Sequence, residues 1–500
     1  MAPSIVTSPS VSTNDPAAPT YTASNGCPVL NPRASARIGG EYGPLLLQDF
    51  HLIDLLAHFD RERVPERVVH AKGAGAYGVF EVTDDISDLT SAKFLASVGK
   101  KTKTFTRFST VGGEKASPDS ARDPRGFSTK LYTEDGVCDW VFNNTPVFFL
   151  RDPTKFPLFI HTQKRNPQTN LKDADAFWDY LTTNQESIHQ VMTLFSDRGT
   201  PYGHRFMHGW SGHTFKLVKD DGSFVYCQIT MKCDQGIKNF TNDEATKIAG
   251  ENPDFATEDL FNAIEAGEYP SWTCYLQTMT LEQAKEFRYS VFDLTKVWPK
   301  SDFPLRRFGK LTLNKNPENY FAEVEQAAFS PSHLVPGFEA SADPVLQSRL
   351  FSYNDTHRHR LGVNYLQIPV NRPENVYNPM ERDGGMRVDG NYGAVANYQS
   401  TFAPLRYSKG VSAAKHEYWA STALEISPEV TDLDYEQPRA MWEVLGRTKG
   451  QQENLVYNVV AHASAAKPEI QKRVAEMFGR VDKGLGEQIA QGLAKKARSQ

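Results

Sequence analysis

The sequence lacks several features that would place the protein in a membrane, in a secreted class or on nucleic acid. Its longest apolar run is a handful of residues around 147–150, far below the roughly 20 that a membrane-spanning helix needs. Its five cysteines form no C-x-x-C pair, so neither a disulfide framework nor a structural zinc site is predicted. A net charge of −5 gives no electrostatic reason to expect binding to nucleic acid or an anionic membrane.

Targeting signals are also missing. Residues 1–24 have neither the charged and apolar segments of a secretory signal nor the Lys and Arg of a mitochondrial transit peptide. The last residues, Ala497-Arg-Ser-Gln500, are not the S-K-L type of peroxisomal address. We therefore expect an intracellular protein, peroxisomal or cytoplasmic, with the compartment left open.

The composition predicts a globular protein that begins with an irregular segment and a helix. Hydrophobic residues make up 39% and charged residues 23%, which is typical of folded domains, and 500 residues usually divide into two or more of them. Residues 1–24 are rich in Ser, Thr, Pro and Ala, and apolar residues at helical spacing predict a helix over 45–59.

Short β-rich runs dominate the middle of the chain. They lie at 104–110, 126–133, 138–149, 213–218, 223–232 and 271–280. Asp135-Gly136 and Asp221-Gly222 mark hairpin turns between neighbouring runs. The pattern favours an antiparallel barrel or sandwich over alternating βαβ units, with helices inserted at 174–198 and 243–267.

The last third of the chain changes character twice. Residues 316–428 are rich in Pro, Asn, Gly and Tyr and have little periodicity, apart from a helix around 346–353. So long an irregular stretch is expected to wrap over the barrel or a neighbouring subunit. Helical patterns at 440–446, 454–463, 468–481 and 485–497 then predict a small bundle. The predicted class is α+β, with an N-terminal arm (1–70), a β-barrel (71–315), a wrapping segment (316–431) and a C-terminal helical domain (432–500).

One glycine motif is misleading. Gly73-Ala-Gly75-Ala-Tyr-Gly78 fits the G-x-G-x-x-G pattern, but dinucleotide binding requires a helix to open at the third glycine. The β-branched residues that follow predict a strand instead. We expect these glycines to let a strand pass close to a flat ligand or a neighbouring backbone.

The segment Arg349-Leu-Phe-Ser-Tyr353-Asn-Asp-Thr-His357 carries the strongest chemical signal. Arg349 and Tyr353 are four residues apart, so in a helix their side chains lie on one face. A guanidinium is always charged and favours the phenolate form of a neighbouring phenol. Such a phenolate suits iron as a hard anionic ligand. The alternative is an ordinary intrahelical contact followed by a solvated basic tail.

This segment resembles the haem-ligand motif of catalases. In that family a tyrosine is the established ligand of the haem iron. The resemblance, and not the spacing of the residues, therefore implies that Tyr353 binds iron. Far away, Arg67-Val-Val-His70-Ala-Lys-Gly-Ala-Gly resembles the distal motif of the same family. The order of arm, barrel, irregular segment and helical tail is also similar over nearly the whole chain. The resemblance implies an eight-stranded antiparallel β-barrel, haem b, a homotetramer, and disproportionation of hydrogen peroxide to water and dioxygen, which protects the cell from peroxide.

The resemblance also implies roles for individual residues. His70 would be the acid–base catalyst, Asn143 would hold the peroxide, and Tyr353 would be the iron ligand. In a strand Arg107 and Ser109 share a face, so Ser109 could fix the tautomer of His70 while Arg107 reaches a haem propionate. The implied haem-binding residues are Arg67, Val69, Arg107, Phe156, Arg349 and Arg360. The implied channel residues are Val111, Asp123, Phe148 and Phe149.

A second site for NADPH is implied at positions that bind it in small-subunit catalases. These positions are His189, Ser196, Arg198, Lys232, Gln277, Val297 and Trp298. Two neighbours depart from the family pattern, because His208 stands where Asn is common and Lys300 where His is common. The alternative is a surface basic cluster with ordinary salt bridges.

Two other functions fit the same resemblance. A haem protein of this fold could act on organic or lipid hydroperoxides, which a wider channel would favour. A haem carrier or redox sensor would need a disabled distal side, yet His70, Ser109 and Asn143 are all present.

Overall fold

The structure is a computed structural model that describes residue 13, residues 15–408 and residues 425–498. The chain forms two compact units, Met1–Pro65 and Glu66–Gln500. In the first unit, helix α1 (Phe50–Phe59) begins at Asp49, whose side chain accepts a hydrogen bond from the N–H of Leu52. The predicted helix is therefore present but starts later than 45, and none of its residues is buried.

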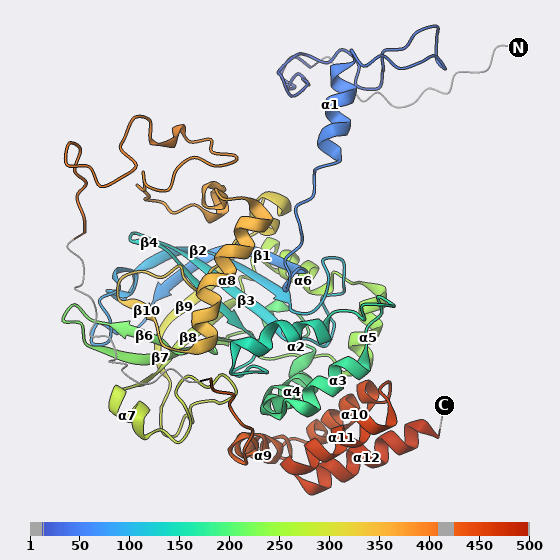
Figure 1. The fold of residues 1–500 in the computed structure, drawn as a ribbon, viewed down its shortest axis with the longest axis vertical. Coiled ribbons are helices and arrows are strands. Elements are labelled where there is room, and N and C mark those ends of the chain that lie inside the picture. Colours follow the sequence, from blue (N-terminus) through green and yellow to red (C-terminus); the bar gives the residue numbers. More distant parts are fainter. Residues whose placement is uncertain (1–12, 14, 409–424, 499–500) are drawn as a thin grey trace, which may run out of the picture. The chain divides into compact units, whose positions relative to one another are not determined.

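The second unit contains a closed ring of strands (Figure 1). Eight antiparallel strands of the described residues pair in the order β1–β2–β3–β4–β5–β7–β8–β9, and β9 pairs with β1. Two further strands extend from β7, because β6 pairs with β7 and β10 pairs with β6. The strands are β1 (Gly73–Val82), β2 (Lys101–Thr110), β3 (Arg125–Thr133), β4 (Gly136–Asn143), β5 (Gly209–Trp210), β6 (Phe215–Val218), β7 (Phe224–Cys233), β8 (Ser271–Met279), β9 (Arg306–Lys315) and β10 (Phe338–Ala340). The predicted eight-stranded antiparallel barrel is confirmed.

The two faces of the barrel have different partners. Phe108, Phe127 and Phe142 are paired across β2, β3 and β4 and are buried in the main apolar core. Because side chains alternate along a strand, Arg107 and Ser109 on β2 point to the other face. That outer face carries the candidate site.

The glycines of the misleading motif lie in β1, as the strand prediction required. A Cβ atom on Gly73 would lie 2.3 Å from the carbonyl oxygen of Phe108, and one on Gly78 would lie 2.1 Å from that of Thr312. These glycines therefore allow close approach of neighbouring backbones, which is one of the two expected reasons.

The inserted helical intervals each contain two helices. The first holds α3 (Ala174–Thr183) and α4 (Ile188–Phe195), after the shorter α2 (Phe156–Gln163). The second holds α5 (Asn242–Glu251) and α6 (Phe255–Glu265). Pro253 separates α5 from α6, because a proline disfavours helical geometry in the residue before it. The predicted helical intervals at 174–198 and 243–267 are therefore helical, each with one interruption. A short α7 (Leu281–Glu286) follows β8.

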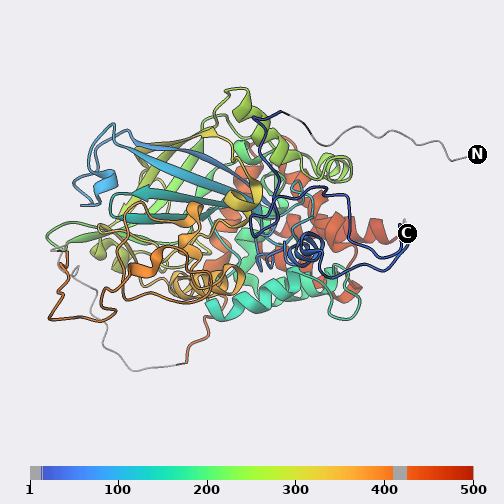
Figure 2. The ribbon, with the colours of Figure 1, turned by 90° about the horizontal axis from the view of Figure 1, so that it is seen from above.

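Four helices end the chain and pack against α3 and α4 (Figures 1 and 2). They are α9 (Leu433–Leu445), α10 (Gln451–Ala463), α11 (Pro468–Val481) and α12 (Lys483–Ala497). The bounds of α11 match the prediction, and Pro468 occupies its first turn as expected. The helical bundle is therefore confirmed.

The irregular segment contains one long helix, α8 (Pro344–Leu361). Asp343 caps its start by accepting hydrogen bonds from the N–H groups of Val345 and Leu346, and Gly362 ends it with φ of +92°. A π-helical turn, Phe321–Glu325, precedes it. The part of the segment at 409–424 lies outside the described residues. The domain boundaries at 70, 315 and 431 stay a prediction.

One predicted strand was too long. The run at 138–149 continues only to Asn143, where β4 ends. Beyond it the chain leaves the ladder, because the side chain of Asn144 accepts a hydrogen bond from Arg125 N–H at 2.7 Å and the N–H of Phe148 donates to Leu294 at 2.9 Å.

No helix in the described ranges is both long and apolar enough to cross a membrane. All five cysteines are free thiols, and four of them are buried.

A buried ion pair joins the irregular segment to the outer face of the barrel. Lys130 and Asp139 face each other across β3 and β4, with Lys130 Nζ 2.9 Å from Asp139 Oδ1 and no exposed side-chain surface on either residue. His333 Nδ1 lies 2.8 Å from Asp139 Oδ2. Burial alone would raise the pKa of Asp139, but Lys130 and His333 lower it below its ordinary value.

Replacing Lys130 with Met should strongly destabilise the protein, because it leaves a buried carboxylate without its cation. We expect a loss of about 3–5 kcal/mol, measured as a lower midpoint of thermal unfolding. The matched control is Lys103→Met, which removes a surface pair with Glu374 worth about 0–1 kcal/mol. Equal shifts for the two variants would contradict the prediction.

Candidate active site

Two adjoining cavities lie between the outer face of the barrel and α8. The first has a volume of about 210 Å³ and the second about 260 Å³. They share part of their lining, which comes from the segment before β1, from β4, from the start of α2 and from α8. The shared residues are Val69, His70, Val141, Asn143, Phe156, Arg349, Ser352 and Tyr353. The structure therefore brings the two predicted motifs together around one space.

His70 is held from three directions. Its N–H donates to Val111 at 3.1 Å, its carbonyl accepts from Arg107 Nη1 at 2.8 Å, and its Nδ1 lies 2.9 Å from Ser109 Oγ. Its φ of +64° is uncommon for a residue with a side chain. Such a conformation persists where surrounding contacts fix it, and it is typical of functional sites.

A row of three residues crosses β2, β3 and β4 beneath His70. Ser109 pairs with Gly126, and Gly126 pairs with Asn143. A Cβ atom on Gly126 would lie 2.4 Å from Ser109 Oγ and 2.7 Å from His70 Nδ1. Gly126 therefore provides the space that the imidazole occupies, a role that the sequence analysis did not identify.

The protonation state of His70 follows from its surroundings. Burial, and then the positive charges of Arg107, Arg349 and Arg67, lower the pKa of His70 to about 3. The imidazole is therefore neutral at neutral pH. When Nδ1–H donates to Ser109, the other ring nitrogen is left as a base.

On α8, Arg349 and Tyr353 make the predicted contact. Arg349 Nη2 donates to the phenol oxygen of Tyr353 at 2.8 Å and also to the carbonyl of Val141 at 3.2 Å. His213, which lines the second cavity with Arg349, has its Nδ1 2.7 Å from Asp343 Oδ2. Arg349 therefore gives the phenol oxygen a fixed cationic partner, and Tyr353 lines both cavities.

Three further arginines line the first cavity. Arg67 Nη2 donates to the carbonyls of Val324 and Glu325 at 3.0 and 2.8 Å, and Arg360 Nη1 donates to that of Glu325 at 2.7 Å. Arg107 Nη2 donates to Ala71 at 3.0 Å. Backbone carbonyls therefore hold these guanidiniums but supply no negative charge.

The charge of this cavity fits haem. Its lining includes Arg67, Arg107, Arg349 and Arg360 and no carboxylate among the residues that the structure describes. Arg67 Nη1 and Arg107 Nε are buried without a hydrogen-bond partner. The nearby buried carboxylate, Glu325, lies 4.0 Å from Arg67 and 3.9 Å from Arg360. Unpaired buried donors require an anionic ligand, and the two propionates of a haem meet that requirement.

The other predicted haem and channel residues are not all at the cavities. Val69 and Phe156 line both, and Val111 and Phe148 line the second. Phe149 is buried in a separate apolar core, with its ring 4.4 Å from that of Phe159. Asp123 lines a third cavity and reaches the second only through the backbone, because it accepts hydrogen bonds from Val111 and Gly112 N–H at 2.5 and 2.7 Å.

The residues predicted to bind NADPH fall into a basic cluster and a packed group. Burial and the charges of Arg198, Lys232 and Lys300 lower the pKa of His208 to about 4, so these four side chains are neighbours. Gln277 Nε2 instead donates to the carbonyls of Trp298 and Phe303, and Trp298 is buried against Phe303.

The remaining predicted positions lie near these groups. His189 is buried on α4, and burial lowers its pKa to about 4. Ser196 ends α4, and its Oγ accepts a hydrogen bond from the N–H of Arg198 at 3.3 Å. Val297 hydrogen-bonds through its backbone to Gln437 of α9.

Several lining residues were missed by the sequence analysis. They include Ser128, Phe329, Thr356 and His357 of the first cavity, and Ser211, His213 and Leu294 of the second. His357 Nε2 donates to Phe329 at 2.7 Å, and burial lowers the pKa of His357 to about 3. Its place in the Tyr353 motif could have indicated it, one helical turn after the tyrosine. The others depend on contacts between distant segments.

The fold and the site together define a β-barrel protein with a buried, arginine-lined cavity that fits haem. Comparison with known proteins then specifies the family. Residues 22–404 match the family described as catalase, and residues 429–493 match the family described as catalase-related immune-responsive. The chain is 62% identical to the peroxisomal catalase of Candida tropicalis over 474 residues, which cover 94% of this chain and 98% of that protein.

Solved structures agree with the sequence match. The chain resembles a crystal structure of a fungal catalase with a TM-score of 0.94 and 57% identity, covering 95% of this chain and 97% of that chain. It resembles catalase A from Saccharomyces cerevisiae with a TM-score of 0.93 and 57% identity, covering 95% and 99%. The chain belongs to the catalase family. It is therefore a haem enzyme that disproportionates hydrogen peroxide to water and dioxygen, and the predicted function and haem cofactor are confirmed.

Replacing Ser109 with Ala should lower catalytic efficiency while leaving haem content unchanged. The variant removes the hydrogen bond at His70 Nδ1, and one such bond is worth about 1 kcal/mol, or up to about tenfold in rate. Dioxygen release and the haem absorbance band measure the two quantities. The control Ser128→Ala removes a hydroxyl from the first cavity without touching His70. If both variants kept full activity, Ser109 would not position the imidazole.

Proposed function

We propose that His70, Ser109 and Asn143 carry the proton chemistry of this catalase while Tyr353 holds the haem iron. The observation that carries the proposal is the common cavity lining, in which the neutral imidazole of His70 and the arginine-paired phenol oxygen of Tyr353 face the same space. The bound haem would supply the two-electron redox chemistry that turns two molecules of hydrogen peroxide into two of water and one of dioxygen.

His70 acts as a proton shuttle. Its free ring nitrogen takes a proton from one peroxide oxygen and returns it to the other, which turns the leaving oxygen into water. A low pKa suits the return step, because the protonated imidazole releases its proton readily. Ser109 keeps the tautomer in which the cavity-facing nitrogen is the acceptor.

Asn143 and the apolar lining orient the substrate. Asn143 ends β4 and lines both cavities, so its amide N–H can donate to a peroxide oxygen beside His70. Val69, Val111, Phe148 and Phe156 surround this position with apolar surface. A small polar peroxide beside His70 can then hydrogen-bond to both His70 and Asn143.

The haem would be held by charge at its propionates and by ligation at its iron. Tyr353 would bind the iron, and Arg349 would stabilise the anionic form of its oxygen. Arg67, Arg107 and Arg360 would pair with the propionates. This arrangement supports a catalase over a haem carrier, because a carrier needs no distal His, Ser and Asn.

Two variants distinguish the proposed acid–base role of His70 from the proposed iron-ligand role of Tyr353. His70→Ala should retain haem but lose about 10²–10⁴-fold of its dioxygen production, the usual share of an acid–base catalyst. Tyr353→Phe should instead lose haem during purification, because the iron has no phenolate ligand. Haem absorbance and dioxygen release are measured for both.

Two control variants match these changes. His359→Ala removes an exposed histidine of α8, and Tyr365→Phe removes the hydroxyl of a buried tyrosine that hydrogen-bonds Asn354. Both controls should keep haem and activity. Full activity in His70→Ala would overturn the acid–base assignment, and full haem content in Tyr353→Phe would overturn the ligand assignment.

We also propose that the basic cluster of Arg198, His208, Lys232 and Lys300 binds the phosphates of NADPH. Burial, and then the charges of Lys232 and Arg198, lower the pKa of Lys300. Cations that repel one another at a surface favour a polyanionic ligand. Neutral His208 can still hydrogen-bond a phosphate, and Lys300 meets one as a point charge.

Arg198→Gln should weaken NADPH binding about 10–100-fold, because one hydrogen bond to a charged group contributes about 1.5–3 kcal/mol. Fluorescence titration of the purified holoenzyme measures the dissociation constant. The control is Lys247→Gln, which removes an exposed lysine paired with Glu251 on α5. Equal affinities for the two variants would assign the cluster to surface salt bridges only.

We propose in addition that the enzyme is a peroxisomal homotetramer. The relative from C. tropicalis is named a peroxisomal catalase. Helix α1 buries none of its apolar residues within its own unit. Along the irregular segment Met386, Val388 and Phe402 are 84%, 77% and 95% exposed. Apolar surface of this kind is typical of contacts between copies of one chain.

A further inference from the structure

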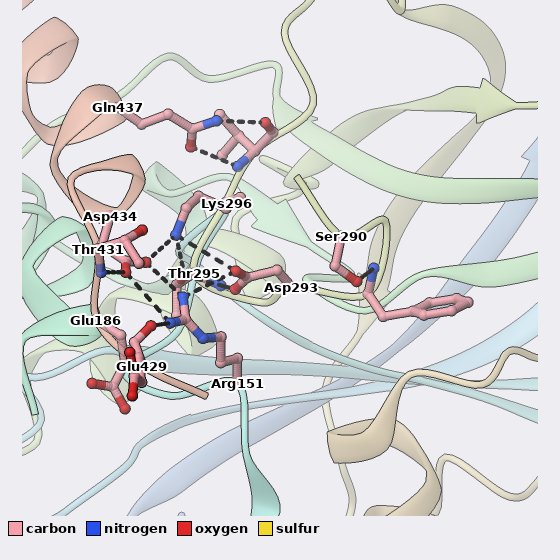
Figure 3. A network of polar contacts seen from close by, with 12 residues as sticks. Arg151, Glu186, Ser290, Asp293, Thr295, Lys296, Glu429, Thr431, Asp434 and Gln437 are labelled. Carbon is pink, nitrogen blue, oxygen red and sulfur yellow. Dashed lines mark hydrogen bonds and ion pairs between the residues drawn. The ribbon is translucent and has the colours of Figure 1, made fainter. Parts of the chain in front are cut away.

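A polar network joins α9, the first of the four C-terminal helices, to two segments that line the second cavity (Figure 3). The first segment holds Phe148 and Arg151, and the second holds Asp293 and Leu294. The N–H of Phe148 donates to the carbonyl of Leu294 at 2.9 Å, and Arg151 Nη1 lies 3.2 Å from Asp293 Oδ2. The side chains of Phe148 and Leu294 both line the second cavity, so these contacts connect the two sides of one wall.

Asp434 of α9 is the centre of this network. Its carboxylate accepts from Arg151 Nη1 at 2.5 Å, from Lys296 Nζ at 2.7 Å and from the N–H of Thr431 at 3.0 Å. The side chains of Asp434 and Lys296 are 2% and 4% exposed. This buried carboxylate shares both cations with Asp293, which lies 3.2 Å from Arg151 and 3.5 Å from Lys296, so Asp434 ties α9 to both segments.

Gln437 adds a second attachment one turn further along α9. Its amide oxygen accepts from the N–H of Val297 at 2.8 Å, and its Nε2 donates to the carbonyl of Val297 at 2.9 Å. The two bonds pair the side chain with a backbone unit of the segment, as a neighbouring strand would. Figure 3 shows Asp434 and Gln437 reaching the segment from the same helix.

We propose that Asp434 and Gln437 are positioning residues that set the width of the peroxide approach by holding the Phe148–Leu294 wall. The inference rests on the proposed assignment of this cavity to the peroxide. It adds that a helix outside the cavity determines which peroxides react. With the wall fixed, hydrogen peroxide enters and a branched alkyl hydroperoxide is disfavoured by its bulk.

The test compares how fast the holoenzyme reacts with hydrogen peroxide and with tert-butyl hydroperoxide, followed by stopped-flow absorbance of the haem. Gln437→Ala should raise the rate with tert-butyl hydroperoxide severalfold relative to that with hydrogen peroxide. Amide hydrogen exchange should also speed up at 148–151 and 293–298, where the loosened wall opens more often. Gln452→Ala removes a hydrogen bond from α10 to the carbonyl of Trp442 on α9, away from the cavity wall. This control should change neither the rate ratio nor the amide exchange.

Two further variants make the outcome decisive. Asp434→Asn should shift the ratio in the same direction, and if it fails to fold, Gln437→Ala alone carries the test. Leu294→Ala widens the second cavity directly, because it removes a side chain that lines it. A shifted ratio in Leu294→Ala with none in Gln437→Ala, or an equal shift in Gln452→Ala, would overturn the role of α9 and leave the peroxide assignment intact. A wild-type enzyme that failed to react with hydrogen peroxide would instead overturn the proposed function.

Discussion

Excess positive charge in a buried cavity is the constraint on which the rest of this structure depends. Four guanidiniums line the first cavity and keep their charge despite the burial. Carbonyl groups of the π-helical turn before α8 orient Arg67 and Arg360, and one carboxylate, that of Glu325, lies 4.0 and 3.9 Å from these two arginines. The positive charge of the lining therefore exceeds the negative charge beside it, and the two propionates of a haem would balance the remainder. Tyr353, which hydrogen-bonds Arg349, lines the same cavity.

The same charge controls the protonation of His70. His70 is neutral because three arginines and burial oppose its protonation, so the cations proposed to hold the cofactor also keep the imidazole unprotonated. Propionates beside Arg67 and Arg107 would offset part of that opposition and raise the pKa of His70. Binding of the cofactor would therefore also change how readily His70 accepts a proton. Arg107 links them directly, since its guanidinium holds the carbonyl of His70.

The sequence predicted what local spacing encodes. The Arg349–Tyr353 contact follows from helical periodicity, and the shared face of Arg107 and Ser109 follows from strand alternation. The inserted helical intervals were predicted without their interruptions, because their apolar spacing continues through the asparagine and the proline that divide them. Gly126 could not be identified, because its role appears only when β2, β3 and the segment before β1 meet. The contact of Arg67 with Glu325 and those of α9 with Arg151, Lys296 and Val297 join residues more than a hundred positions apart, which no local pattern reveals.

The ring of strands closes beside the site through a very short ladder. β4 meets β5 at one residue pair, Asn143 with Trp210, and β5 is only two residues long. Between β5 and β6 the chain turns away to place His213 against Asp343. Asn143, which lines both cavities, therefore lies at the shortest pairing of the barrel. We expect heat to open this pairing before the longer ladders of β1, β2 and β3, so that loss of activity would precede unfolding of the barrel.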